Sequence, residues 1–290
     1  MAVRGALRRL ARHGQPPWLH TEVARRMAQR LELIRFQPER VVDWWSQLGA
    51  GAPLLVQAYP RSDFLRVEPD ARWAQWARQA AARPWWARVA RRTQDVAVIE
   101  QDRDIAPGVG LVWANMMLHA VDDPLALFER WHSLLQFDGF VMFSCLGPGT
   151  LRELRTLYHR LGWPTPTPAY VDMHDLGDML VHAGFADPVM DQEVLTLRWS
   201  SSAALLSELR AMGANASPQR RAGLRTPRWR ERLERELATL AAPDGSIGLT
   251  FEVAYGHAFK AAPRLRTGQA TTVSLQDMRA MVASARAAPK

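Results

Sequence analysis

Short apolar runs alternate with helix-like stretches through the first half of this chain, and this alternation limits the fold more than any other feature. Five candidate strands lie at 40–43, 64–68, 95–99, 110–114 and 139–145. Helical spacing of apolar residues occurs between them, at 70–82 and 124–136. Because the strand candidates are almost continuously apolar, both of their faces are expected to be buried. The alternation predicts an α/β fold with a doubly wound parallel sheet.

Past the fifth strand candidate the pattern changes. A helix is predicted near 150–161, and the Pro/Thr run 164–168 is a stiff connector, because proline cannot continue regular structure. Asp172 has the residue type of a helix N-cap, and the helix 173–182 should end before Gly184. This half of the chain is therefore expected to mix helices with irregular connections.

Two further strands are expected near the C-terminus. They lie at 189–199 and 248–259, on either side of an Arg-rich helical stretch at 200–240. Following five parallel strands, they predict a terminal antiparallel pair at the edge of the sheet. The tail 263–290 has room for one short helix.

The N-terminal segment and the single cysteine indicate where the chain resides. Residues 1–20 are basic and punctuated by proline and glycine, which predicts a loose leader before a helix at 21–37. The leader has no apolar core, so no secretory signal is expected. No apolar run approaches the roughly 18 residues that span a bilayer. Cys145 is the only cysteine, which excludes an internal disulfide and fits a cytoplasmic location.

The net charge of +8 comes almost entirely from arginine, because Lys260 and Lys290 are the only lysines. A basic surface attracts acidic partners, and both nucleic acid and an acidic carrier protein are candidates. The sequence has no zinc-ligand cluster and no basic run interleaved with aromatic residues. We therefore expect no metal, and nucleic acid is the less favoured partner.

The turn after the first strand has the layout of a nucleotide site. Asp43 ends the strand, Gly49 and Gly51 follow, and Glu68 comes at the end of the next apolar run. In α/β nucleotide sites glycines let the backbone approach the ligand, and an acid after the second strand binds ribose hydroxyls. These four residues are candidates for an adenosyl cofactor. An ordinary strand-to-helix turn is the alternative.

Three polar residues follow other strand candidates, where ligands of open parallel sheets bind. Asp102 could approach an adenine ring or could be a solvated loop acid. Asn115 and His119 follow the fourth strand, where cofactor and substrate would meet, although His119 could equally be a packed histidine. Cys145 lies in an apolar strand without a cationic neighbour, and we do not expect it to act as a nucleophile.

Several longer stretches carry a family resemblance, and they span residues 21 to 262. They are Val23–Leu31, Leu111–His119, Asp138–Ser144, Val171–Phe185, Leu209–Asn215 and Phe251–Phe259. In combination they resemble the malonyl-acyl-carrier-protein O-methyltransferases of biotin synthesis. The mitochondrial complex I assembly methyltransferase-like proteins look similar too.

The resemblance implies a seven-stranded, Rossmann-like class I methyltransferase that uses S-adenosyl-L-methionine. It implies a domain at 21–262 with helical lid segments at about 147–170 and 200–240. The substrate would be the free carboxylate of malonyl-acyl carrier protein, an acidic partner. By position, the family's motif residues are Asp43, Gly49, Gly51, Glu68 and Asn115.

The glycine loop departs from the family pattern. Trp45 and Gln47 occupy the first two of its three glycine positions, so either the loop is two residues longer or the pocket is altered. An altered pocket would favour a weak or inactive methyltransferase-like assembly or binding protein. A methyltransferase acting on a protein side chain is a further alternative.

Methylation of a carboxylate needs little acid–base help, because the nucleophile is already ionised at neutral pH. The enzyme mainly aligns the reacting atoms and removes water. No catalytic residue is therefore assigned. Arginine binds carboxylates through two N–H groups, and the candidate anchors in the expected lid are Arg152, Arg155, Arg210 and Arg220.

Overall fold

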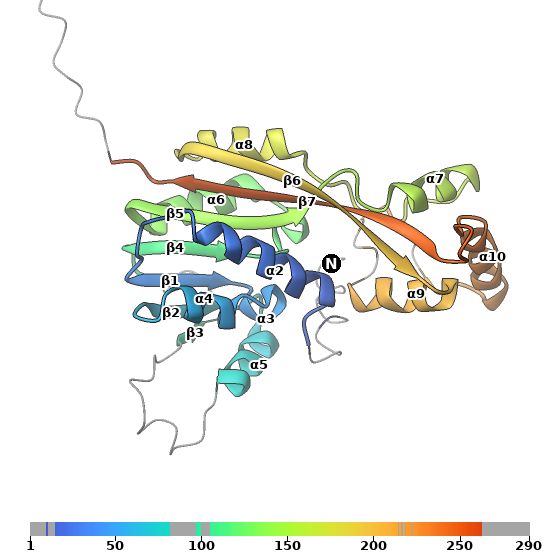
Figure 1. Cartoon of the computed structure of the whole chain (residues 1–290), viewed down its shortest axis with the longest axis horizontal. Coiled ribbons are helices and arrows are strands. Elements are labelled where there is room, and N and C mark those ends of the chain that lie inside the picture. The colour runs from blue at the N-terminus through green and yellow to red at the C-terminus, as the bar shows by residue number, and fades with distance from the viewer. Residues whose placement is uncertain are drawn as a thin grey trace, which may run out of the picture.

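The computed structural model describes residues 10, 15–81, 97–99, 105–213, 215, 217, 219–221 and 223–262. Its strands are β1 (Arg40–Trp44), β2 (Asp63–Val67), β3 (Ala97–Ile99), β4 (Val109–Ala114), β5 (Leu135–Leu146), β6 (Ala186–Trp199) and β7 (Ile247–Phe259). Within the described ranges these seven strands form one mixed sheet in the order β3-β2-β1-β4-β5-β7-β6 (Figure 1).

The first five strands pair in parallel, whereas β7 lies antiparallel to both β5 and β6. The α/β class and the antiparallel pair at one edge are therefore confirmed. The last strand lies inside the pair, between β5 and the edge strand β6.

The helices are α2 (Trp18–Leu31), α3 (Ser46–Gly49), α4 (Ala52–Ala58), α5 (Ala71–Ala81), η3 (Leu118–Ala120), α6 (Pro124–Leu134), α7 (Arg152–Arg160), α8 (Met173–His182), α9 (Ser202–Ala211) and α10 (Pro227–Ala238). The bounds of α8 agree with the sequence, and the Asp172 side chain accepts a hydrogen bond from the backbone of His174. The run 164–168 has neither helix nor strand, as predicted.

Two helix predictions were wrong at their bounds. α2 begins at Trp18, inside the expected leader, because Pro17 has the extended backbone of a residue that precedes a helix. It ends at Leu31 rather than 37. The stretch 200–240 holds two helices, because Gly213 (φ 98°) and Gly223 (φ 89°) adopt left-handed backbone between them. The tail 263–290 lies outside the described residues.

Successive residues of the parallel strands point into two separate cores. Val41 and Leu111 face one core with the apolar side of α2, and Val42 and Val112 face the other with α6 and α8. The central strands β1 and β4 therefore bury both faces, as their apolar sequences predict.

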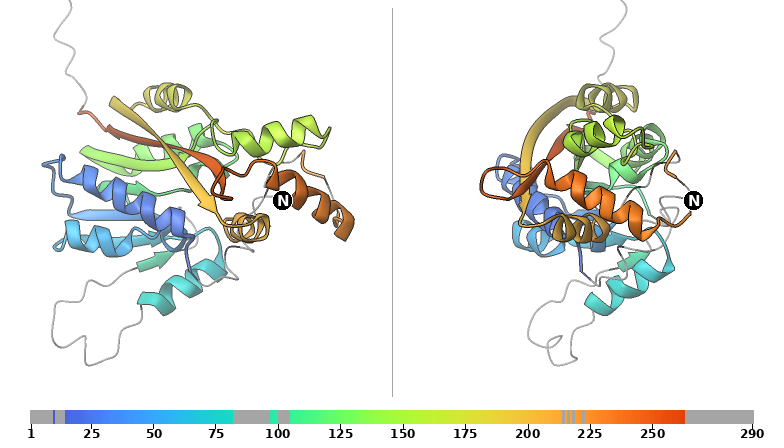
Figure 2. Two further views of the ribbon diagram at one scale, coloured as in Figure 1. Left: turned by 45° about the vertical axis from the view of Figure 1, so that its right-hand side comes forward. Right: turned by 90° about the vertical axis from the view of Figure 1, so that its right-hand side faces the viewer.

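Beyond the carboxyl ends of the parallel strands, β6 and β7 extend past the rest of the sheet (Figure 1). There α7, α9 and α10 gather at one end of the molecule (Figure 2). Leu154 of α7, Leu205 of α9 and Leu233 of α10 are buried in the same core as Phe251 of β7. The end at which ligands of open α/β sheets bind is thus covered by a helical cluster, α7, α9 and α10.

Candidate functional site

The segment after β1 forms a single helical turn, and the residue on each side of it has a left-handed backbone conformation. Trp45 (φ 53°) leads out of β1, and Ala50 (φ 55°) ends α3. Gly51 has a φ of −81°, a backbone conformation open to any residue. A Cβ at Gly51 would lie 2.3 Å from Nε1 of Trp113, so the glycine is needed for space. This segment, residues 45–51 and here called the glycine loop, therefore lies directly against the end of β4.

Two buried carboxylates lie beneath the glycine loop. Glu68 is 1% exposed, and its Oε1 accepts a hydrogen bond of 3.1 Å from the backbone N–H of Gln47. Its Oε2 and both oxygens of Asp43 make no hydrogen bond of standard geometry, although the Ser46 side chain lies close enough to Asp43 to oppose part of the rise that burial causes in its pKa. Burial raises the pKa of Glu68 to about 9 and that of Asp43 to about 7. Three buried oxygens without donors fit a ligand that brings hydroxyl or ammonium groups.

Asn115 holds the glycine loop to the sheet. Its Nδ2 donates to the carbonyl of Gly49 at 2.6 Å and to the carbonyl of His20 at 2.8 Å. Its Oδ1 accepts a 2.6 Å hydrogen bond from Ser144 Oγ. Because both N–H groups of the fully buried amide have protein partners, Asn115 positions the loop.

His20 was not among the residues predicted for the site, and it connects α2 to the same loop. Its Nδ1 lies 3.0 Å from the carbonyl oxygen of Leu48, and burial lowers its pKa to about 4. The neutral ring therefore donates through Nδ1 to that carbonyl. The residue was missed because it falls in the expected leader, and its only signal is its polarity beside the apolar Leu19 and Val23.

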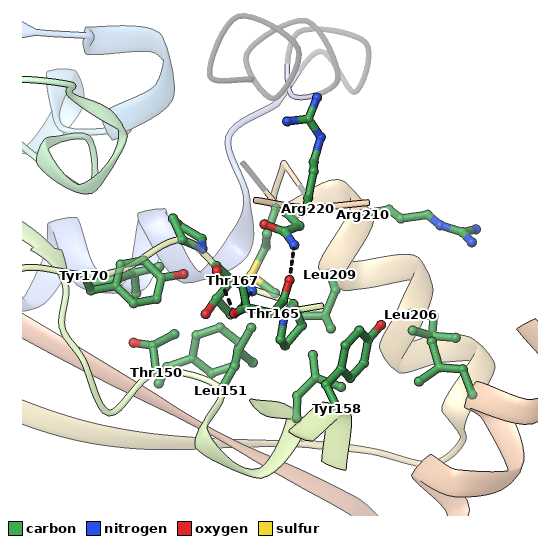
Figure 3. Close-up of a pocket in the computed structure, with 18 of the residues that line it drawn as sticks. Thr150, Leu151, Tyr158, Thr165, Thr167, Tyr170, Leu206, Leu209, Arg210 and Arg220 are labelled. Carbon is green, nitrogen blue, oxygen red and sulfur yellow. Dashed lines mark hydrogen bonds between the residues drawn. The ribbon is translucent and has the colours of Figure 1, made fainter. Parts of the chain in front are cut away.

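A cavity of about 490 Å³ opens beside this network, beneath the helical cluster (Figure 3). His20, Met116 and His119 line it from the sheet side, Tyr158 from α7 and Leu209 from α9. Asp43, Gly49, Gly51, Glu68 and Asn115 are not among its lining residues. His20 is thus the residue that contacts both the glycine loop and the cavity.

His119 lies in the cavity wall as a neutral ring. Its Nδ1 accepts a hydrogen bond of 3.3 Å from the backbone N–H of Leu146, and its ring packs edge-on against Tyr170. Burial lowers its pKa to about 3, helped by the nearby His20. The proton of the neutral ring is therefore on Nε2.

The four arginines predicted as anchors occupy different places. Arg210 and Arg220 belong to the cavity wall but are exposed, and their side chains extend away from the other labelled residues (Figure 3). Arg152 is absent from that wall and pairs with Glu153 at 3.2 Å on the surface. Arg155 is also absent from the wall and donates to the carbonyl of Pro148.

Three cavity residues escaped the sequence reasoning. Arg225 is half-buried, with its Cζ 4.3 Å above the ring of Trp229. Burial raises the pKa values of Tyr158 and Tyr170 to about 12, so both hydroxyls stay protonated. None of these residues follows a strand of the sheet, which was the positional signal used to select candidates.

Cys145 contributes no chemistry to this site, as expected from the sequence. Cys145 is buried, and burial raises its pKa to about 12, so no thiolate forms. Asp102 lies outside the described residues. Among the described residues no three metal-ligating side chains cluster, and no described helix is long and apolar enough to cross a membrane.

Comparison with solved structures shows the class of fold. The YcgJ protein of Bacillus subtilis matches with a TM-score of 0.54 and 11% identity over 81% of this chain and 98% of its own. The BH2331 protein of Bacillus halodurans matches with a TM-score of 0.52 and 11% identity over 81% of this chain and 99% of its own. Together with the glycine loop and the acid that follows β2, these matches indicate the α/β fold of the class I methyltransferases.

Sequence comparison identifies the family. A malonyl-[acyl-carrier protein] O-methyltransferase of Gallionella capsiferriformans is 36% identical over 259 residues, covering 88% of each chain. The protein with the same name from Laribacter hongkongensis is 37% identical over 252 residues, covering 86% of this chain and 84% of its own. This chain belongs to the malonyl-[acyl-carrier protein] O-methyltransferase family. No general family model matches the sequence.

Proposed function

We propose that this protein transfers the methyl group of S-adenosyl-L-methionine to the free carboxylate of a malonyl group carried by acyl carrier protein, in the cytoplasmic synthesis of biotin. Family membership supports this reaction. The structural observation that carries it is the position of His20, which bonds to the glycine loop and also lines the cavity under the helical cluster. A cofactor at the loop and an acyl group in the cavity would therefore meet.

On the cofactor side, Glu68 and Asp43 would accept hydrogen bonds from ribose hydroxyls, because their free oxygens are buried without donors. Gly49 and Gly51 would allow close approach, and Asn115 would hold the loop. Asp102 remains a candidate for the adenine ring. The bound cofactor supplies an electrophilic methyl group.

On the acceptor side, the chain would align an ionised carboxylate and strip its water. Leu151, Leu154 and Phe251 give the cavity an apolar wall that favours desolvation. A general base is unnecessary for this nucleophile, which agrees with the neutral state of His119. Its Nε2–H is available as a hydrogen-bond donor.

We propose that the helical cluster is the lid of the site and also receives the carrier protein. Arg210, Arg220 and Arg221 are exposed at the cavity. Positive charge at this position would attract an acidic carrier and orient its acyl arm toward the opening.

Two measurements on the full-length protein test the proposal. S-adenosylhomocysteine should bind in calorimetric titration, and malonyl-acyl carrier protein incubated with S-adenosylmethionine should gain one methyl ester by mass spectrometry. Absence of both binding heat and methyl ester would refute the enzyme. The variant Glu68→Gln removes the proposed cofactor acid from the same assays. Its matched control is Glu39→Gln, because Glu39 is an exposed acid just before the start of β1.

A methyltransferase-like binding protein is the second candidate. It is favoured by the complete hydrogen bonding of Asn115 within the protein and by the absence of Asp43 and Glu68 from the cavity wall. Expression in a biotin-requiring strain that lacks its own malonyl methyltransferase separates the candidates. Rescue by the wild type supports the enzyme, and loss of that rescue in Glu68→Gln supports Glu68 as part of its site. A binding protein without catalysis would give no rescue. A methyltransferase of protein side chains would give no rescue.

A further inference from the structure

The described charged residues of the cavity wall are all cationic. Among the described residues the wall contains no aspartate or glutamate, but it contains five arginines: Arg210, Arg220, Arg221, Arg225 and Arg230. Beside them the wall is mainly apolar, with two tyrosines. Such a surface favours an acyl group that ends in an anion, because a neutral end gains nothing from unpaired guanidinium groups.

Four of these arginines are poorly placed to bind the end of an acyl group. Arg230 donates to Glu234 at 2.7 Å, so its charge is already paired. Arg220 donates to the carbonyl of Ser217 at 3.1 Å and is exposed. Arg210 and Arg221 are exposed as well. Water screens exposed guanidinium groups and weakens their selectivity.

Arg225 differs from them in its surroundings. It is half-buried, and its guanidinium lies 4.3 Å above the ring of Trp229. Stacking uses the face of the planar group and leaves its N–H edge free for a carboxylate. Within the described part of the chain, no hydrogen bond or ion pair uses these N–H groups. Partial burial and the nearby Arg221 both lower the pKa of Arg225, and an anion bound there would offset both effects.

Tyr158 adds a neutral donor to the same cavity wall as Arg225. Its hydroxyl stays protonated, because burial raises its pKa to about 12 and Arg225 opposes only part of that rise. The hydroxyl makes no hydrogen bond within the described residues. A hydroxyl and a guanidinium on one side of an apolar cavity can together bind both oxygens of a carboxylate.

We propose that Arg225, assisted by the hydroxyl of Tyr158, binds the terminal carboxylate of the acyl group and makes the cavity selective for acyl thioesters that end in an anion. The assignment rests on the proposed function but concerns recognition of the acyl group. It replaces the anchors expected from sequence, because Arg152 and Arg155 do not line the cavity.

Binding of small thioesters tests the assignment without methyl transfer. Malonyl-pantetheine and acetyl-pantetheine are titrated into the full-length protein with saturating S-adenosylhomocysteine. Wild-type protein should prefer malonyl-pantetheine. Arg225→Gln should weaken malonyl binding by roughly 10- to 100-fold, the range expected for a lost charge-assisted hydrogen bond, and leave acetyl binding unchanged. Tyr158→Phe should weaken malonyl binding by a smaller factor.

Arg230→Gln is the matched control, since this arginine lines the same cavity but is paired with Glu234. Arg230→Gln should still bind malonyl-pantetheine more tightly than acetyl-pantetheine. Arg225→Glu should instead favour β-alanyl-pantetheine, whose end is cationic, a gain that misfolding cannot produce. An unchanged malonyl preference in Arg225→Gln, or an equal loss in Arg230→Gln, would overturn the assignment. If Arg225 controls binding but no methyl ester forms, the proposed reaction fails while the assignment stands.

Discussion

The backbone N–H of Gln47 donates a 3.1 Å hydrogen bond to the carboxylate of Glu68, joining the glycine loop to the end of β2. Only one carboxylate oxygen is used, and Oε2 is buried without a donor. The residue at a family glycine position thus contributes its backbone to the site, while its side chain is free to differ from glycine.

Replacement of Glu68 by Gln should weaken S-adenosylhomocysteine binding by about 10-fold or more. An amide can place its N–H₂ group where the ligand needs an acceptor, and a buried polar group left without its partner has about this effect. Isothermal titration calorimetry measures the change. Glu39→Gln should bind as the wild type does, and equal affinity in the two variants would remove Glu68 from the cofactor site.

Stability should fall as the pH rises from about 7 to about 9 in the ligand-free protein. Burial raises the pKa of Glu68 from 4.5 to about 9, so the folded state binds this proton more tightly than the unfolded state does. The resulting stability is complete below the unfolded pKa and is lost as the pH rises through about 9. Asp43, whose pKa is raised to about 7, contributes a loss of the same sign that is nearly complete at the lower end of this window. His20 and His119, whose pKa values are lowered, are neutral in both states over the window.

Thermal unfolding, monitored by circular dichroism at several pH values in this range, gives the slope of stability against pH. Glu68→Gln should flatten it, because the titrating group is gone. A slope that is the same in the wild type and the variant would mean that Glu68 is ionised in the folded protein.

Gly51→Ala should destabilise the protein by about 1–3 kcal/mol, the usual effect of overpacking. The added Cβ would lie 2.3 Å from Nε1 of Trp113. Trp113→Phe removes that nitrogen and with it the clash. The double variant should therefore lose less unfolding free energy than the sum of the losses in the two single variants. Urea unfolding of the four proteins measures this. Gly248→Ala, where the new Cβ meets only ordinary contacts, should be tolerated.

Asn115→Ala should cost about 2–4 kcal/mol, because it leaves the carbonyls of His20 and Gly49 and the hydroxyl of Ser144 without their partner. Ser144→Ala should cost less. A double-mutant cycle in denaturant should give a coupling energy of about 0.5–3 kcal/mol for residues in one network. Strictly additive losses would show that the two side chains act independently.

Reversal of the exposed charges, Arg220→Glu with Arg221→Glu, should raise KM for malonyl-acyl carrier protein by about 10-fold at low salt, through slower association. Methylation of malonyl-pantetheine should change little, because this small substrate has no acidic carrier surface. Added salt should reduce the difference between the variant and the wild type. Equal effects on both substrates would place the two arginines at the acyl group instead of the carrier surface.

The sequence by itself determined the sheet and the position of the glycine loop. Strands buried on both faces must be apolar at every position, so β1, β4 and β5 are visible as continuous apolar runs. Asp43 and Glu68 were selected as candidates for the same reason, since polar residues at strand ends mark the binding edge of such a sheet. Local pattern was sufficient because these features depend on residues close together in the chain.

Only the tertiary structure decided which side chains form the cavity. His20 lies in a segment expected to be a loose leader, and it reaches the site because α2 packs across the sheet. Arg225 precedes α10 and lines the same cavity as Tyr158 of α7, which is distant in the sequence, whereas Arg152 of α7 pairs with Glu153 at the surface. Every arginine of the expected lid has the same chemistry in the sequence, and only the packing of distant elements distinguishes the half-buried, unpaired Arg225 from the exposed ones.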